Sequence, residues 1–125
     1  MIRTSGLHHL HLAVRDLDSS LRFYKSVFGM EEQFRSGPTM IFLSTPGSDD
    51  LITLNQDETQ RDVAGRSGGI AHFGFKLRPG ADLDSAVREV ESAGGTLVSR
   101  GEHAPGVPFV YVRDPDGYVI ELGNP

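Results

Sequence analysis

The sequence predicts an α+β fold in which two paired βαβββ modules form a curved mixed sheet around a metal-containing cavity. Three observations lead to this prediction. The chain contains an internal repeat, each copy opens with a strand followed by a helix, and a histidine stands at the same place in both copies. A repeat of this length indicates two copies of one supersecondary unit, which bury a continuous core only when they pair.

The repeat is visible in three separated places that occur in the same order in both copies. The matched segments are 9–14 with 72–77, 16–22 with 82–88, and 51–54 with 119–122. Agreement at three ordered positions is hard to obtain by chance, so the chain divides into module 1 at about 5–56 and module 2 at about 69–123. The polar, aperiodic segment at about 57–68 is then a linker.

In the first copy, residues 7–14 alternate with the period of a strand, which places His9 and His11 on one face. Asp16 or Asp18 can cap the helix that follows, and Gly29 can end it. The further strands of module 1 are expected at 31–35, 40–45 and 51–55. Module 2 is expected to repeat the order, with a strand at 69–77, a helix at 82–93, and strands at 96–100, 108–113 and 118–122.

Composition limits the possible functions. The 125 residues, 38% of them hydrophobic, suit a single domain. The net charge is −5, and no basic block suggests binding to nucleic acid. No segment has the apolar length of a membrane span or the pattern of a signal peptide, so we expect a cytoplasmic protein with no membrane partner. The absence of cysteine leaves histidine and oxygen ligands for any metal.

Three residues are the expected metal ligands. His9 and His72 occupy equivalent points on the first strand of each copy, and Glu121 lies on the last strand of module 2. Two imidazoles and one carboxylate form a facial set that leaves coordination positions open for substrate, oxygen or water. Thr53 takes the place of Glu121 in module 1, so we expect three protein ligands. Alternatively, either histidine could be an ordinary core or surface residue of its strand, and Glu121 could be a carboxylate paired with an arginine.

Two longer segments resemble a known family. The first is residues 7–14 with Asp16-Leu17, Phe23-Tyr24 and Phe28-Gly29, and the second is the ending at 111–122. Together they are similar to the vicinal oxygen chelate superfamily, which includes glyoxalase I, fosfomycin-resistance transferases, methylmalonyl-CoA epimerase, bleomycin-resistance proteins and type I extradiol dioxygenases. The resemblance covers nearly the whole chain. It implies paired βαβββ modules and a divalent metal held at His9, His72 and Glu121.

The C-terminal segment also resembles the pattern of type I extradiol dioxygenases. The matching residues are Gly101-Glu102-His103, Val110-Tyr111, Asp114-Pro115-Asp116-Gly117 and Glu121. The resemblance implies that Tyr111 hydrogen-bonds the substrate, that His103 assists from the mouth of the cavity, and that the metal is Fe(II), with Mn(II), Zn(II) or Ni(II) as alternatives. His11 is the best substitute for the acid–base histidine of these enzymes, although it could simply line the cavity.

Three functions remain open. The first is extradiol-type cleavage of a catechol-like small molecule that chelates the metal through two oxygens. The chain has one pair of modules, whereas most such dioxygenases have two. The second is a glyoxalase- or epimerase-type lyase or isomerase, and the third is a metal-free, bleomycin-resistance-like binding module. The resemblance also implies a homodimer, with each site lying within one chain or shared between two.

Overall fold

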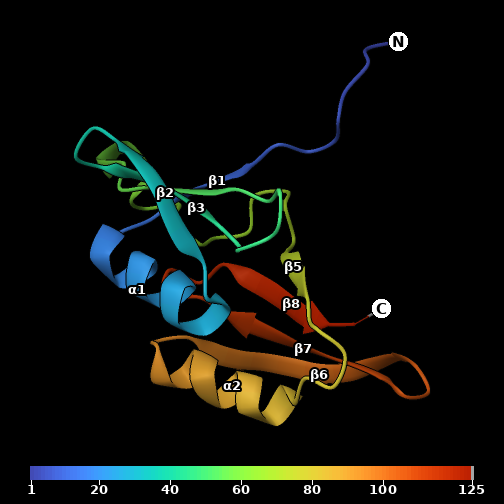
Figure 1. Ribbon diagram of the computed structural model, residues 1–125. Helices are drawn as coiled ribbons and strands as arrows, with labels where there is room; N and C mark the ends of the chain where they lie inside the picture. Colours follow the sequence, from blue (N-terminus) through green and yellow to red (C-terminus); the bar gives the residue numbers. More distant parts are fainter. Residues whose placement is uncertain (125) are drawn as a thin grey trace.

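The computed structural model describes residues 1–124, which form two four-stranded sheets and two α-helices (Figure 1). The first sheet has the order β1-β4-β3-β2 and the second the order β5-β8-β7-β6. In module 1 the elements are β1 (Leu10–Ala13), α1 (Leu17–Phe28), β2 (Glu31–Ser36), β3 (Met40–Ser44) and β4 (Ile52–Asn55). In module 2 they are β5 (Phe73–Lys76), α2 (Leu83–Ser92), β6 (Thr96–Ala104), β7 (Val107–Arg113) and β8 (Val119–Gly123). The matching element and strand orders confirm the α+β fold with two βαβββ modules.

The two helices begin where short acidic side chains can cap them. Asp16 accepts hydrogen bonds from the backbone N–H groups of Asp18 and Ser19, and Asp82 caps α2 by accepting from Asp84. Helix α1 ends at Gly29, whose φ of 64° is the left-handed conformation that glycine adopts without strain. The cap and the stop of α1 are therefore those that the sequence predicts.

A single apolar core joins the two modules. Strand residues of both sheets contribute to it, and so do Phe23 and Tyr24 of α1, both of which are fully buried. Phe28 at the end of α1 stacks on Phe75 of β5 with ring centroids 4.0 Å apart. Helix α1 therefore packs on both modules, and the two repeats share one core.

A buried polar contact joins the start of α1 to the turn before β8. The backbone N–H of Arg15 donates to Asp116 Oδ1 at 2.8 Å, and its guanidinium donates to the carbonyl of Asp116 at 3.0 Å and of Ala64 at 2.6 Å. The Ser20 hydroxyl donates to Asp116 Oδ2 at 3.0 Å. These bonds join residues of both modules and of the linker, so they fix how the three parts lie against one another.

Asp114, in the same turn, is only 3% exposed. Its Oδ2 accepts from the Tyr24 hydroxyl at 2.8 Å, and its Oδ1 accepts from three backbone N–H groups, those of Asp116, Gly117 and Tyr118. Burial outweighs these favourable bonds and raises the pKa of Asp114 to about 6. The turn therefore holds a carboxyl group whose ionisation bears on stability.

The structure adds three details to the prediction. The strands form two four-stranded sheets, and β1 and β5 each lie at the edge of a sheet. Both begin later than expected, at Leu10 and Phe73, because residues 7–9 and 69–72 have no partner strand within the chain. Strand β6 continues to Ala104 because it pairs with β7 almost to the turn.

The linker between the modules has structure of its own. It contains a short 3₁₀ helix, η1 (Glu58–Gln60), and buries Ala64. Gly65 has a φ of +75°, and a Cβ there would come within 2.0 Å of the Asp116 carbonyl oxygen. The linker is thus packed against the turn of module 2. Within residues 1–124, no helix has the length and hydropathy needed to cross a membrane.

Candidate metal centre

The face of the second sheet that is turned away from the core carries one row of side chains. The strand register places Gly74 of β5, Glu121 of β8, Tyr111 of β7 and Ser99 of β6 opposite one another. Adjacent residues such as Ile120 and Val112 point into the core and are fully buried. Glu121 and Tyr111, two of the predicted site residues, therefore lie side by side.

His103 and His72 complete this cluster. His103 Nε2 lies 2.8 Å from Glu121 Oε1, and its ring stacks on Phe109 with centroids 4.3 Å apart. The His72 ring meets the edge of the Tyr111 ring at a centroid distance of 4.9 Å. Module 2 alone thus gathers four of the six predicted residues: His72, His103, Tyr111 and Glu121.

Tyr111 is held in its protonated form. Desolvation is the largest cause that raises the pKa of its phenol, followed by the Glu121 charge and the hydrogen bond to that carboxylate. A phenol that stays protonated near neutral pH can donate one hydrogen bond. Tyr111 is therefore suited to orient an oxygen-bearing ligand beside Glu121.

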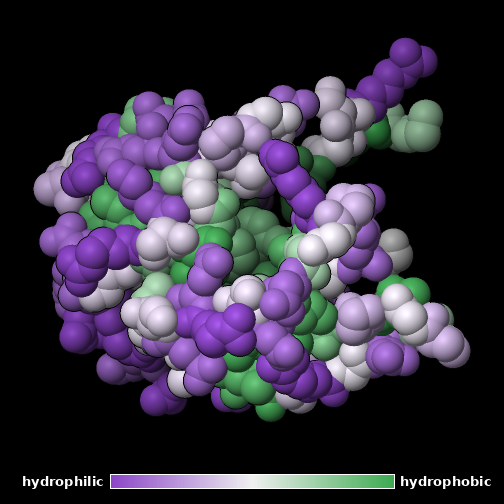
Figure 2. Space-filling view, turned by 60° about the horizontal axis from the view of Figure 1, so that its bottom comes forward, coloured by the Kyte–Doolittle hydropathy of each residue, from purple (hydrophilic) through white to green (hydrophobic). Residues whose placement is uncertain are grey.

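His9 is the predicted ligand that does not join this cluster. Its Nδ1 lies 2.9 Å from Nδ1 of His8, and both belong to the N-terminal segment that projects from the body (Figures 1 and 2). Leu7 in that segment is 93% exposed. No three His, Asp or Glu side chains among residues 1–124 are placed to hold one metal ion. The expectation that one chain brings His9, His72 and Glu121 to a single point is therefore not met within the chain.

The first sheet has its own row on the corresponding face. Its register aligns His11 of β1, Thr53 of β4, Phe42 of β3 and Phe34 of β2. Thr53 is fully buried, and in the described part of the chain its hydroxyl is the one buried side-chain polar atom without a hydrogen-bond partner. Where module 2 has Glu121, module 1 thus has a small neutral side chain.

The residues present fit a divalent metal on the second sheet. Imidazole and carboxylate are suitable donors for Fe(II), Mn(II) or Zn(II). Gly74 stands opposite Glu121. A Cβ at position 74 would lie 3.1 Å from the carbonyl oxygen of Glu121 and 3.4 Å from the Cβ of Glu121. The sequence prediction missed this glycine, although its position matches His11 in the repeat. Glycine at this position allows β5 to approach β8 closely beside Glu121.

Hollows flank the edge strands β1 and β5. One, of about 450 Å³, is lined by His9, Asp50 and Lys76 among others, and another, of about 390 Å³, by His11, His72 and Tyr118 among others. The two are related by the repeat, since His9, just before β1, lines the first and His72, just before β5, lines the second. The predicted imidazoles therefore border open space along the unpaired edges.

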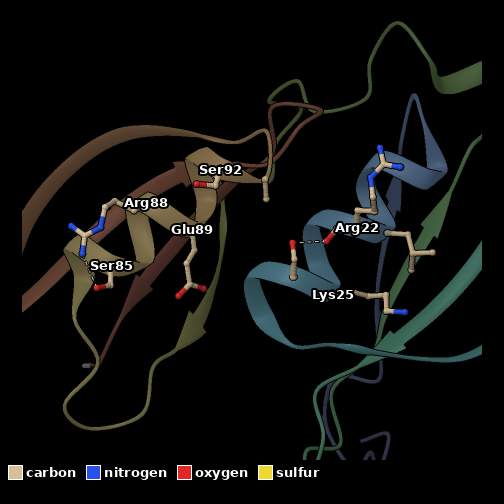
Figure 3. Close-up of a pocket in the computed structure, with 9 residues that line it drawn as sticks. Arg22, Lys25, Ser85, Arg88, Glu89 and Ser92 are labelled. Carbon is tan, nitrogen blue, oxygen red and sulfur yellow. Dashed lines mark hydrogen bonds between the residues drawn. The ribbon is translucent and has the colours of Figure 1, made fainter.

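A larger hollow than these two, of about 1020 Å³, lies elsewhere, between α1 and α2. Figure 3 shows that the charged ends of Arg88 and Lys25 extend away from the gap and do not converge in it. A binding site usually has several polar groups that converge on one ligand. We therefore place the candidate site on the sheets and not in this groove.

Comparison with known proteins identifies the family to which this chain belongs. Residues 6–122 match the model of the glyoxalase/bleomycin resistance protein/dioxygenase superfamily. The chain is 30% identical to a probable lactoylglutathione lyase of Vibrio parahaemolyticus, over 91% of this chain and 86% of that protein. It is also 30% identical to the catechol-2,3-dioxygenase of Bacillus subtilis, over 89% of this chain but 38% of that protein.

A solved structure shows the same fold. It is the fosfomycin resistance protein FosX of Listeria monocytogenes with Mn(II) and a dihydroxypropylphosphonic acid. The TM-score is 0.78 at 21% identity, over 97% of this chain and 90% of that one. On the match of nearly its whole length to the family model, this chain belongs to the glyoxalase/bleomycin resistance protein/dioxygenase superfamily.

Proposed function

We propose that this protein is a divalent-metal-dependent enzyme that opens the ring of a catechol-like substrate with molecular oxygen. The observation that carries the proposal is the contact of His103 and Tyr111 with Glu121, because it assembles the residues of the dioxygenase-like pattern at one place. His72 borders the same place through its contact with Tyr111. The proposed ligands are His9, His72 and Glu121, and Fe(II) is the proposed metal.

The metal, when bound, supplies a Lewis acid that chelates both vicinal oxygens of the substrate. The other steps belong to side chains. The Tyr111 hydroxyl can donate a hydrogen bond to a substrate oxygen, because a phenol is protonated near neutral pH. His103 Nε2 lies beside Glu121 and can hold a proton at the mouth of the site. His11 is the proposed acid–base residue on the facing sheet.

Metal analysis and oxygen uptake test this proposal together. Protein purified without air should contain Fe(II), and it should consume oxygen when a panel of catechols is added. Oxygen uptake that depends on the catechol supports ring cleavage. Stoichiometric metal without any uptake would leave a metal enzyme of another class, and protein that binds no divalent metal would indicate a binding module.

A lyase or isomerase is the second candidate, and chain length favours it. This chain spans 86% of the lactoylglutathione lyase of V. parahaemolyticus but only 38% of the catechol dioxygenase. Thr53, however, cannot serve as a fourth carboxylate ligand in module 1. Glutathione hemithioacetal isomerisation without oxygen uptake would establish this alternative.

We further propose that the active unit is a homodimer in which each site is shared. Among the edge strands, β1 and β5 occupy equivalent places in the two modules and each has one unpaired side, and unpaired edges readily pair with another chain. The segments just before them are exposed, with Leu7 at 93% and Ile70 at 69%. Pairing β1 of one chain with β5 of another would carry His9 toward the partner's second sheet, which completes a ligand set that one chain leaves open.

Mixing two inactive variants tests the shared site. His9→Ala and His72→Ala should each be inactive alone, because each lacks one ligand in every site. If sites are shared, unfolding and refolding an equal mixture should restore about a quarter of the wild-type activity, since half the dimers are mixed and carry one intact site. Sedimentation should show a dimer. An inactive mixture of confirmed heterodimers would place the whole site within one chain.

Tyr111→Phe tests the role of the phenol. The change removes one hydroxyl and leaves the aromatic contacts with His72 and Phe109 in place. We expect kcat for catechol cleavage to fall by roughly 10- to 100-fold, as for the loss of one hydrogen bond made in the transition state. Metal content should stay unchanged. An unaltered rate would remove the assigned role of Tyr111.

A further inference from the structure

The contact between His103 and Glu121 spans two strand spacings of the second sheet. His103 lies on β6 and Glu121 on β8, and β7 runs between these two strands (Figure 1). Neighbouring strands are roughly 4.8 Å apart, so the two side chains must reach toward each other across about 10 Å. They nevertheless bring His103 Nε2 within 2.8 Å of Glu121 Oε1. The contact therefore passes over β7.

Phe109 is the side chain of β7 that lies under this contact. Its ring stacks on the His103 imidazole with centroids 4.3 Å apart and an angle of 25° between the two planes. The register pairs Phe109 with Gly101 of β6, and a Cβ on Gly101 would come within 2.6 Å of Cζ and 2.9 Å of Cε1 of the ring. The ring thus occupies the place where a side chain at position 101 would stand, and its face supports the imidazole.

His103 needs such support because the strand itself holds it loosely. The pairing of β6 with β7 shifts register between Glu102 and Ala104, so His103 has no cross-strand partner in the ladder. A bulge of this kind changes the direction of a side chain. The His103 side chain is also 48% exposed, and an exposed polar contact costs the conformational entropy of the groups that form it. Stacking on Phe109 reduces the number of orientations that the imidazole can adopt.

The supported imidazole in turn orients the carboxylate. Nε2–H of His103 can donate to Oε1 of Glu121, and a carboxylate with one oxygen engaged in this way can still bind a metal ion through the other. Hydrogen bonds of this kind fix a metal ligand in its binding orientation, and their loss lowers metal affinity by about 10- to 100-fold. The chain of contacts therefore runs from Gly101 through Phe109 and His103 to Glu121.

We propose that Phe109 is a positioning residue of the metal centre: its ring, seated over Gly101, holds the His103 imidazole against Glu121 and so orients this carboxylate toward the metal. The proposal rests on the proposed function, because that function makes Glu121 a metal ligand. In this role Phe109 acts through His103 and not on the metal itself. Its effect on metal binding must therefore disappear when the imidazole is absent.

A double-mutant cycle on metal binding tests this role without turnover. Metal-free protein is titrated with Mn(II) in the absence of air, and the EPR signal of free Mn(II) gives the Kd. His103→Ala should weaken Mn(II) binding by about 10- to 100-fold. Phe109→Leu should weaken it by about three- to tenfold, the size expected of one aromatic contact. In the His103→Ala background, Phe109→Leu should change the Kd no further.

Gly101→Ala perturbs the same contact from the other strand. The φ of Gly101 is not positive, so alanine fits the backbone, but its Cβ would displace the Phe109 ring. Gly101→Ala should therefore weaken Mn(II) binding about as much as Phe109→Leu does. Added to Phe109→Leu, it should cause no further loss, because the shorter side chain leaves room for the Cβ.

Two further variants show whether the ring face is what matters. Phe109→Tyr keeps the ring and should keep the wild-type Kd. Phe34→Leu is the matched control, since Phe34 stacks on Phe42 in the first sheet and has no place in this chain of contacts. It should also leave the Kd unchanged. A cooperative thermal melt for each variant shows that the protein remains folded.

The outcomes separate this inference from ring cleavage. An equal loss from Phe109→Leu with and without His103, no loss in the wild-type background, or a wild-type Kd in His103→Ala would each overturn the inference. Oxygen uptake with catechol alongside any of these results would leave ring cleavage standing alone. A loss that depends on His103, without any oxygen uptake, would support the positioning role and reject ring cleavage. Wild type that binds neither Mn(II) nor Fe(II) would overturn both.

Discussion

Replacing His72 by alanine is expected to abolish tight binding of Fe(II), Mn(II) or Zn(II). His72 stands at the start of β5, directly against Tyr111, and Glu121 lies on the neighbouring strand. A two-histidine, one-carboxylate set cannot lose an imidazole without losing most of its affinity. Changes to residues that merely support metal ligands already lower affinity by about 10- to 100-fold, so the loss of a ligand should exceed that range.

Metal analysis after dialysis measures the effect of His72→Ala directly. Wild type should retain close to stoichiometric metal, and the variant should retain almost none. Asp49→Ala is the control, since Asp49 is an exposed side chain to which we assign no role at the metal. Stoichiometric metal in His72→Ala would reject the proposed ligand set while leaving the fold untouched.

Replacing Asp114 by alanine is expected to produce the largest loss of stability. The carboxylate accepts from the buried Tyr24 hydroxyl and from three backbone N–H groups of its own turn. Alanine would remove the acceptor of the buried Tyr24 hydroxyl and of the Asp116 and Tyr118 N–H groups, whereas Gly117 N–H keeps the carbonyl oxygen of residue 114. The free energy of unfolding should fall by on the order of 3–5 kcal/mol. Denaturant unfolding would measure this change, and the exposed Asp49→Ala should show none of it.

Asp114→Asn isolates the effect of pH. Because the pKa of Asp114 is raised to about 6 from 3.8, the folded state binds this proton more tightly than the unfolded state does. The resulting stabilisation is complete below pH 3.8 and is lost as pH rises through about 6, a change of about 3 kcal/mol. Asparagine cannot ionise and can still accept at Oδ1.

Exposed carboxylates change the stability with pH in the opposite direction. Hydrogen bonds to the capped helix ends lower the pKa of Asp16 and Asp82, so their contribution is lost when pH falls. These contributions are the same in wild type and in Asp114→Asn, so they cancel when the free energies of unfolding of the two proteins are subtracted. The stability of Asp114→Asn relative to wild type should therefore rise between pH 4 and 6. A difference that does not change with pH would mean that Asp114 titrates normally.

Local sequence signals predicted most of the fold. The caps of α1 at Asp16 and Gly29 depend on contacts within a few residues, so the sequence contains all the information they require. The late starts of β1 and β5 were not predictable in the same way. Alternation shows that residues 7–9 can form a strand, but a strand requires a partner, and no strand among residues 1–124 pairs with them.

Tertiary contacts were the part of the site that the sequence concealed. Asp114-Pro115-Asp116-Gly117 has the composition of a turn, and nothing local indicates that Arg15 and Tyr24, far away in sequence, would bond to it. His103 was expected at the mouth of the cavity, and the structure places it on β6, where it reaches Glu121. The repeat suggested that His9, His72 and Glu121 meet at one metal ion. Whether they do depends on where His9 lies in space, and local sequence pattern does not determine that.

The glycine opposite Glu121 has a consequence for how the duplicated halves diverged. In module 1 the two neighbouring positions hold a large and a small side chain, His11 and Thr53, and in module 2 the order is reversed, with Gly74 and Glu121. The equivalent positions therefore present an imidazole beside a buried hydroxyl in module 1 and a carboxylate beside a bare backbone in module 2. A duplicated fold thus carries two chemically unlike faces on the same backbone plan.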